Sequence, residues 1–119
     1  MLILVILITT TTLPTRAVER LTIRVSPSVS FAPANLIVRA TIEADADNRG
    51  IVITADSEDF YRSSEIQLEG DRAPRTNMFE FRSLPSGRYN VSAALIGSDG
   101  RQRVVVRQQV NVMASGAGH

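Results

Sequence analysis

The spacing of the apolar residues is the feature that most constrains this chain. From Arg20 onward apolar and polar residues alternate over much of the sequence, most clearly in residues 36–44 and 89–95. Such alternation places successive side chains on opposite faces of an extended strand, so that one face is buried and the other solvated. Between Arg20 and Met113 no segment carries a sustained 3.6-residue period with helix caps. The pattern therefore predicts an all-β protein.

Turn signals divide this region into about seven short strands. Residues 45–50 combine Asp, Asn and Gly, residues 84–87 read Leu-Pro-Ser-Gly, and residues 98–100 form a hairpin turn of the Asp-Gly kind. Residues 27–33 contain two prolines and are predicted to be a kinked edge or a loop. Residues 56–63 are predicted to be a loop fixed by two aromatic side chains. About seven strands in about 95 residues is the rhythm of an antiparallel immunoglobulin-like β-sandwich.

Length and composition limit the possible functions. A chain of 119 residues is long enough for one domain with one hydrophobic core. The formal net charge of +1 provides no concentrated basic surface, and we expect no nucleic-acid partner. Cysteine is absent, which removes disulfides, thiolate nucleophiles and Cys-ligated zinc. Nine of the twelve acidic residues lie between Glu43 and Asp71, which predicts an uneven distribution of surface charge.

The first 17 residues allow two interpretations. Residues 2–8 are an unbroken apolar run, too short for a transmembrane helix but suited to the apolar region of a secretory signal. Small residues at Thr15 and Ala17 suit cleavage after Ala17, although no basic residue follows Met1. Alternatively, residues 2–12 are a first β-strand, since Ile, Val and Thr favour strands. We therefore divide the chain into residues 1–17, a sandwich over 18–113 and a flexible tail over 114–119.

Two stretches resemble PKD-type immunoglobulin-like domains. The first is SPSVSFAPANLIVRATIEADADN (residues 26–48), in which a Pro-rich strand leads into an alternating strand and an Asp-x-Asp turn. The second is LPSGRYNVSAALIGSDGR (residues 84–101), with a Gly-x-Tyr-x-Val run before a hairpin. The Trp-containing core of PKD domains is absent, so the resemblance is to a divergent immunoglobulin-like or fibronectin-III-like domain. It implies extracytoplasmic adhesion, spacing or assembly, and it places Tyr89 at a structural tyrosine corner.

The residue types available for catalysis and metal binding are few. The single histidine, His119, is the last residue of the sequence, and a Ser-His-Asp site needs a rigidly held base. Asp45, Asp47 and Asn48 lie on one predicted loop, whereas Asp56, Glu58 and Asp59 lie on another, about 17 Å away across a five-residue strand. One loop alone lacks the oxygen ligands that calcium requires. We therefore expect no catalytic residues, no metal, no cofactor and no enzymatic activity.

Candidate interaction residues come from two places. Phe60, Tyr61 and Arg62 form an aromatic and basic cluster typical of interface anchors, although one or both aromatic rings could instead close the end of the sandwich. The second candidate is the apolar N-terminal segment, whose alternate residues could add as a strand to the sheet edge of a neighbour: Leu2, Leu4, Ile6 and Ile8.

Two functions follow from these candidates. The first is an exported binding or adhesion domain that catalyses nothing and contacts a protein or glycan partner in the periplasm, at the cell surface or outside the cell. The second is a structural subunit of a surface fibre or envelope layer, assembled by strand addition of the N-terminal segment. They differ over whether residues 1–17 remain in the mature protein. No transmembrane helix is expected in either case.

Overall fold

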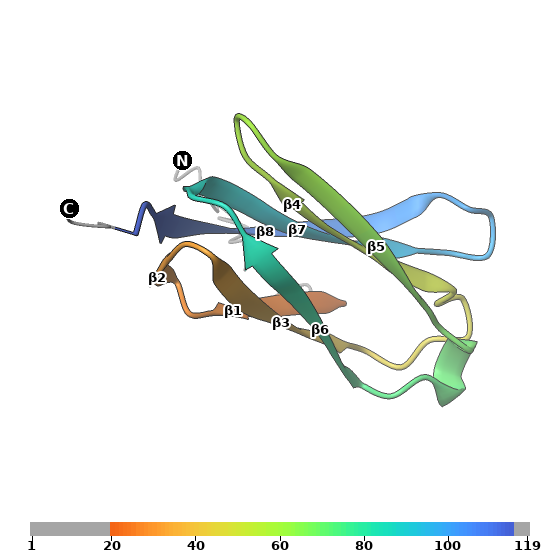
Figure 1. The fold of residues 1–119 in the computed structure, drawn as a ribbon. Coiled ribbons are helices and arrows are strands. Elements are labelled where there is room, and N and C mark those ends of the chain that lie inside the picture. The colour runs from red at the N-terminus through yellow and green to blue at the C-terminus, as the bar shows by residue number, and fades with distance from the viewer. Residues whose placement is uncertain (1–19, 116–119) are drawn as a thin grey trace, which may run out of the picture.

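Eight strands and one short 3-10 turn make up the part of the chain that the structure describes. The computed structural model describes residues 20–115 (Figure 1). In chain order the elements are β1 (Leu21–Ser26), β2 (Val29–Phe31), β3 (Ala34–Ile42), β4 (Gly50–Asp56), β5 (Tyr61–Gln67), η1 (Gly70–Arg72), β6 (Thr76–Leu84), β7 (Gly87–Ile96) and β8 (Gln102–Met113). The all-β prediction is confirmed, and the strands number eight rather than about seven.

The strands form two sheets that lie against each other as layers (Figure 1). One sheet has three strands in the order β1-β3-β6, and the other has five in the order β2-β8-β7-β4-β5. Four of the strand pairs join elements that are not consecutive in the chain, namely β1 with β3, β3 with β6, β4 with β7 and β2 with β8. The last of these is parallel, whereas the others are antiparallel.

The core lies between the two sheets and follows the alternation of the sequence. In β3 every second residue from Ala34 to Ile42 is buried. In β7 the inward side chains of Tyr89, Val91 and Leu95 have no exposed surface. Burial of one large apolar side chain contributes roughly 1.5–3 kcal/mol before the conformational entropy cost. The intervening residues consequently hold fixed positions on the two outer faces.

The segment that was predicted to be a kinked edge or loop contains β2. Here Val29 pairs with Asn111 and Phe31 with Met113, in parallel with the end of β8. Pro27 follows the last residue of β1 and has no N–H group to continue the ladder with β3. The chain therefore leaves the three-stranded sheet at this point and joins the five-stranded sheet.

The loop predicted over residues 56–63 is shorter in the structure. Asp56 ends β4, and Tyr61 already pairs with it as the first residue of β5. The backbone N–H of Ser57 donates to the carbonyl of Phe60 at 2.8 Å, which closes the hairpin. Because β5 is an edge strand with mostly exposed side chains, its sequence lacks the alternation that identifies a half-buried strand.

Side chains close the gap between the sheets on both sides of the sandwich. On one side the amide of Gln108 in β8 accepts from Val25 N at 2.9 Å and donates to Val25 O at 3.0 Å. On the other side Arg62 of β5 donates to the carbonyl of Arg82 in β6 at 2.8 Å. These contacts tie β1 to β8 and β5 to β6. Residues 20–115 include no helix that is long and apolar enough to span a bilayer.

Candidate binding surface at one end of the sandwich

Phe60 packs against the core at the end of the sandwich that contains the β4–β5 loop. It lies in the short loop between β4 and β5, is partly buried, and packs edge-to-face on Tyr89 with ring centroids 6.2 Å apart. Edge-to-face pairs of this kind add about 0.5–1.5 kcal/mol to the burial of the rings. Phe60 therefore closes the end of the core and is not an exposed anchor.

Tyr89 fixes the neighbouring turn. Its ring is fully buried and its hydroxyl donates to the carbonyl of Pro85 at 2.6 Å, four residues upstream. This is the contact that defines a tyrosine corner. Burial raises the pKa of Tyr89 above its ordinary value, so the hydroxyl keeps the proton that it donates.

Arg62 is engaged with its own chain. Its guanidinium lies 5.1 Å from the centroid of the Phe60 ring, and one of its nitrogens donates to Arg82 O. Tyr61, by contrast, is 64% exposed on the outer face of the five-stranded sheet. The structure thus separates the three predicted residues, because adjacent residues of an edge strand point to opposite faces. Tyr61 is largely exposed, Phe60 is partly buried, and Arg62 is exposed but already bonded within its own chain.

An apolar group that was not predicted lies on the same outer face. Val29, Phe31 and Met113 are 56%, 62% and 50% exposed. The parallel pairing of β2 with β8 brings them together from sequence positions that are more than 80 residues apart. The alternation of Val29 and Phe31 around Ser30 was the available signal, but the two flanking prolines suggested a loop.

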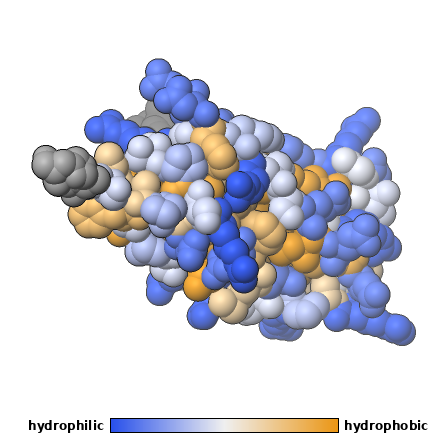
Figure 2. All heavy atoms as spheres, in the orientation of Figure 1, coloured by the Kyte–Doolittle hydropathy of each residue, from blue (hydrophilic) through white to orange (hydrophobic). Residues whose placement is uncertain are grey.

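Val29, Phe31, Tyr61, Arg88 and Met113 form what we call the end surface. Arg88 lies in β7 opposite Asn111 of β8, which in turn pairs with Val29. Tyr61 is four strand spacings from β2, or roughly 19 Å across the sheet. Figure 2 shows apolar atoms gathered at this end, where β2 lies, among blue polar groups. The end surface is thus apolar at both margins and polar between them.

Two shallow hollows meet at Gly87 and Arg88. The first is lined further by Val29, Asn111, Val112 and Met113. The second is lined further by Ser57, Glu58, Asp59 and Ser86. One hollow is therefore largely apolar and the other acidic, with a guanidinium between them.

Of the residues considered for calcium, Asp45, Asp47 and Asn48 lie at the opposite end, in an internal polar network. Asp56, Glu58 and Asp59 lie at the end surface, where Asp56 pairs with Tyr61 and the other two line the second hollow. Arg103 donates to Asp45 at 3.0 Å and to the Oδ1 of buried Asn48 at 2.9 Å, and it lies 3.3 Å from Asp47. Asp47 also accepts from the backbone N–H and the hydroxyl of Ser98.

Hydrogen bonds set the charge state of this network. The N–H of Asp47 and the guanidinium of Arg103 lower the pKa of Asp45. The two bonds from Ser98, followed by the positive charge of Arg103, lower the pKa of Asp47. Within residues 20–115 no group of three or more His, Cys, Asp or Glu side chains is arranged to hold a metal ion. These carboxylates therefore join the β3–β4 loop to the β7–β8 hairpin.

The predicted strand-addition residues Leu2, Leu4, Ile6 and Ile8 lie outside the described residues. The cleavage site predicted after Ala17 lies outside them too.

Comparison with known proteins relates the chain to others by fold alone. No protein-family model matches the sequence, and no curated protein sequence matches it. A superoxide reductase (neelaredoxin) from Ignicoccus hospitalis aligns with a TM-score of 0.64 at 14% identity, covering 79% of this chain and 80% of that chain. A variant of the same enzyme aligns with a TM-score of 0.58 at 15% identity, covering 77% and 78%. A family 76 glycoside hydrolase from a bovine Bacteroides thetaiotaomicron strain aligns with a TM-score of 0.56 at 16% identity, covering 77% of this chain but only 20% of that chain.

These likenesses correct one prediction. We expected no enzymatic activity because the sequence offers few residues suited to catalysis. Superoxide reductase is an enzyme, and its structure and this one share a fold over most of both chains. The prediction that the chain is not an enzyme is therefore wrong, because the structural neighbours of this fold include an enzyme. At 14–16% identity the comparison establishes the shared fold and transfers no site residues.

Proposed function

We propose that this chain is an exported, immunoglobulin-like recognition domain that binds a partner protein through the end surface. The observation that carries the proposal is the cluster of exposed apolar residues beside Arg88 on one outer face. Binding at this surface is compatible with catalysis elsewhere in the molecule.

The strand order supports the immunoglobulin-like assignment. The order β1-β3-β6 corresponds to strands A, B and E of that fold, and β8-β7-β4 corresponds to G, F and C. In this scheme β1 and β2 are two parts of strand A, one in each sheet, and β5 is an additional edge strand beside C. Tyr89 near the start of β7 then occupies the tyrosine-corner position of strand F.

The composition of the end surface supports a protein partner over a glycan. Interface cores are enriched in aromatic residues, Met and Arg, and a few such residues carry most of the binding energy. Phe31, Tyr61, Met113 and Arg88 are of these types. A surface roughly 19 Å wide lies within the dimensions of a standard interface. Export is supported by the apolar residues 2–8 and the small residues before position 18.

Site-specific photo-crosslinking in the native cells tests this proposal. A benzoylphenylalanine placed at Phe31 or at Tyr61 is expected to give one predominant adduct that contains a second polypeptide. The matched control position is Val105, an exposed residue on the same outer face but toward the other end of β8. The same adducts from Val105, or no polypeptide adduct from Phe31 and Tyr61, would exclude the end surface. An adduct that contains only glycan would show that the partner class is wrong.

A second candidate function is a fibre or envelope subunit assembled by strand addition. The favouring observation is that β5 and β6 are the outer edges of their sheets, and within residues 20–115 no further strand pairs with them. Half-buried Phe79 and exposed Met78 lie on β6. An apolar segment such as residues 2–8 of a neighbouring copy would find backbone partners and apolar contacts there.

The intact mass of the mature protein separates the two candidates. A mass that begins at Val18, together with a monomeric elution volume, supports the recognition domain. A mass that retains residues 1–17, together with very large assemblies, supports the fibre subunit and contradicts the first proposal.

A further inference from the structure

The outer face of the three-stranded sheet carries two arginines directly opposite each other. Arg24 of β1 pairs in register with Arg39 of β3, and both side chains are exposed. Like charges directly opposite on neighbouring strands destabilise a sheet. The pair therefore has an electrostatic cost that the fold itself does not explain.

No acidic group in the described chain neutralises this pair. The salt bridges within residues 20–115 involve Arg82 and Arg103, and neither Arg24 nor Arg39 takes part in one. The nearest acidic residue on the same face is Glu80 of β6, two residues along the strand from the Met78 that pairs with Arg39. Its carboxylate is already bound to Arg82 at 2.5 Å. The sheet face thus holds two uncompensated positive charges.

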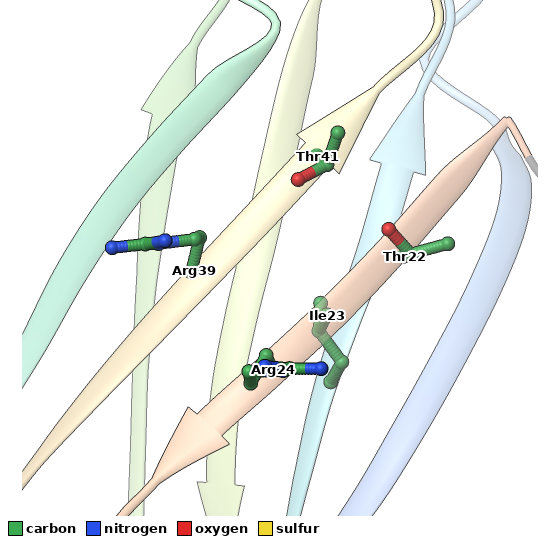
Figure 3. A pocket seen from close by; sticks show the side chains of 5 residues that line it. All are labelled: Thr22, Ile23, Arg24, Arg39 and Thr41. Carbon is green, nitrogen blue, oxygen red and sulfur yellow. The ribbon is translucent and has the colours of Figure 1, made fainter.

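Hydroxyl groups lie one step along the same face. Thr22 and Thr41 are opposite each other, two residues from the arginines, or roughly 7 Å along the strands. A hollow is lined by these four side chains and by Ile23 of β1 (Figure 3). Two guanidinium groups and two hydroxyls on one small surface provide donors to an anion and offer no carboxylate to oppose it.

We propose that this hollow binds a tetrahedral oxyanion group, sulfate or phosphate. In Figure 3 the side chain of Arg39 extends from β3 away from β1, so that the two guanidinium groups do not converge. Mutual repulsion between the two guanidinium groups favours this divergence. An oxyanion between β1 and β3 would offset the repulsion and draw the flexible arginine side chains over the hollow. The hollow lies on the three-stranded sheet, whereas the end surface lies on the five-stranded sheet. A test of the hollow is therefore independent of the proposed function.

Titration with inorganic sulfate, followed by amide chemical shifts at constant ionic strength, tests the site. The amides of Thr22, Arg24, Arg39 and Thr41 are expected to shift together and to saturate, with a dissociation constant on the order of millimolar. The double variant Arg24→Gln, Arg39→Gln should weaken binding by about tenfold or more. Arg107→Gln is the matched control, because Arg107 is an exposed arginine on the outer face of the other sheet. It should leave the affinity unchanged.

Two kinds of result in the sulfate titration would overturn the proposal. Shifts that do not saturate, that spread evenly over the surface, or that persist in the double variant mean that sulfate is an adventitious ion only. An equal loss of affinity in the Arg107 variant would show that overall charge, and not the hollow, attracts sulfate.

A second arm identifies the source of the oxyanion. If a polysaccharide carries it, a sulfated oligosaccharide should move the same amides at least about tenfold more tightly than inorganic sulfate does. If the natural ligand is the free ion, the sulfated oligosaccharide should bind no more tightly than sulfate alone. In both cases the unsulfated oligosaccharide should cause no shifts at these four residues.

Discussion

The two ends of the sandwich differ in whether their side chains are bonded within the chain or exposed to solvent. At the end that contains the β3–β4 loop, the polar side chains bond to one another, with Arg103 joined to Asp45, Asp47 and Asn48. At the end that contains β2, the apolar side chains of Val29, Phe31, Tyr61 and Met113 remain at least half exposed. The first end is rich in residues that resemble a metal site by composition. The second offers the surface on which we base the proposed function.

The difference shows that composition alone does not reveal which side chains are already bonded within the chain. Carboxylates that already accept hydrogen bonds from their own chain have fewer lone pairs available for a ligand. Exposed apolar residues have no such internal partner, and they lower the free energy when another surface covers them. Five substitutions test this contrast, and they are ordered by the size of the expected change in stability.

Asn48→Ala should have the largest effect. Asn48 is fully buried, accepts from Arg103 and donates to the carbonyl of Glu43 at 2.9 Å. Its removal leaves the carbonyl of Glu43 without this partner and takes one of three side-chain partners from Arg103, and we expect a loss of about 2–4 kcal/mol in the free energy of unfolding. Urea denaturation measures it, with exposed Gln109→Ala as a control that should change by less than about 0.5 kcal/mol. A loss equal to that of the control would mean that the network does not hold this end together.

Tyr89→Phe should cost about 1–2 kcal/mol, because the variant keeps the ring and loses the bond to Pro85. Tyr61→Phe is the matched control, since Tyr61 is mainly exposed, and it should leave stability within about 0.5 kcal/mol. Thermal unfolding of the two variants side by side measures the difference. Equal midpoints would show that the corner contact contributes nothing to the turn beneath the end surface.

Acid should weaken the polar end before the rest of the molecule. The pKa values of Asp45 and Asp47 are lower in the folded state than their ordinary value of 3.8. Their contribution to stability is therefore complete above that value and is lost as pH falls through the lower folded-state pKa. The urea midpoint should decline in this pH window, and it should decline less steeply in Asp47→Asn. Parallel pH profiles for the variant and the native chain would contradict this assignment.

Phe31→Ser should change the free energy of unfolding by no more than about 0.5 kcal/mol, since the ring is mostly exposed. The same substitution should remove the polypeptide adduct captured through Tyr61. A large loss of stability would show that Phe31 has a structural role. The end surface would then lose the main residue proposed to bind a partner.

Arg24→Gln should have a similarly small effect, and of the opposite sign. It removes repulsion from Arg39, so stability should rise by about 0.2–0.5 kcal/mol at low salt, and the gain should diminish as salt screens the charges. Arg107→Gln again serves as the control. A loss of stability in Arg24→Gln would show that the arginine has an internal partner.

Sequence periodicity predicted much of the fold where one strand face is buried. Residues 36–42 and 89–95 alternate because one side of β3 and of β7 faces the core, and their inward residues are buried as the pattern predicts. The predicted strand extended to Ala44, but β3 ends at Ile42 and Ala44 is exposed. The pattern did not predict the full extent of β5, because its side chains are mostly exposed and do not alternate. Of the candidate site, Tyr61 is largely exposed in the structure. The contacts of Phe60 with Tyr89 and of Arg62 with Arg82 join residues at least 20 positions apart, so a local pattern could not predict them.

The sequence by itself determined that this chain is all-β, because alternation of apolar and polar residues is a local property of each strand. The tertiary structure decided which strands are neighbours, and hence that Phe31 meets Met113, that Arg24 faces Arg39, and that Asp45 and Asp47 are occupied by Arg103. Each of these encounters depends on backbone pairing or side-chain contacts between residues 15 to 82 positions apart. Such pairing is set by how the whole core packs, and a local pattern carries no information about it.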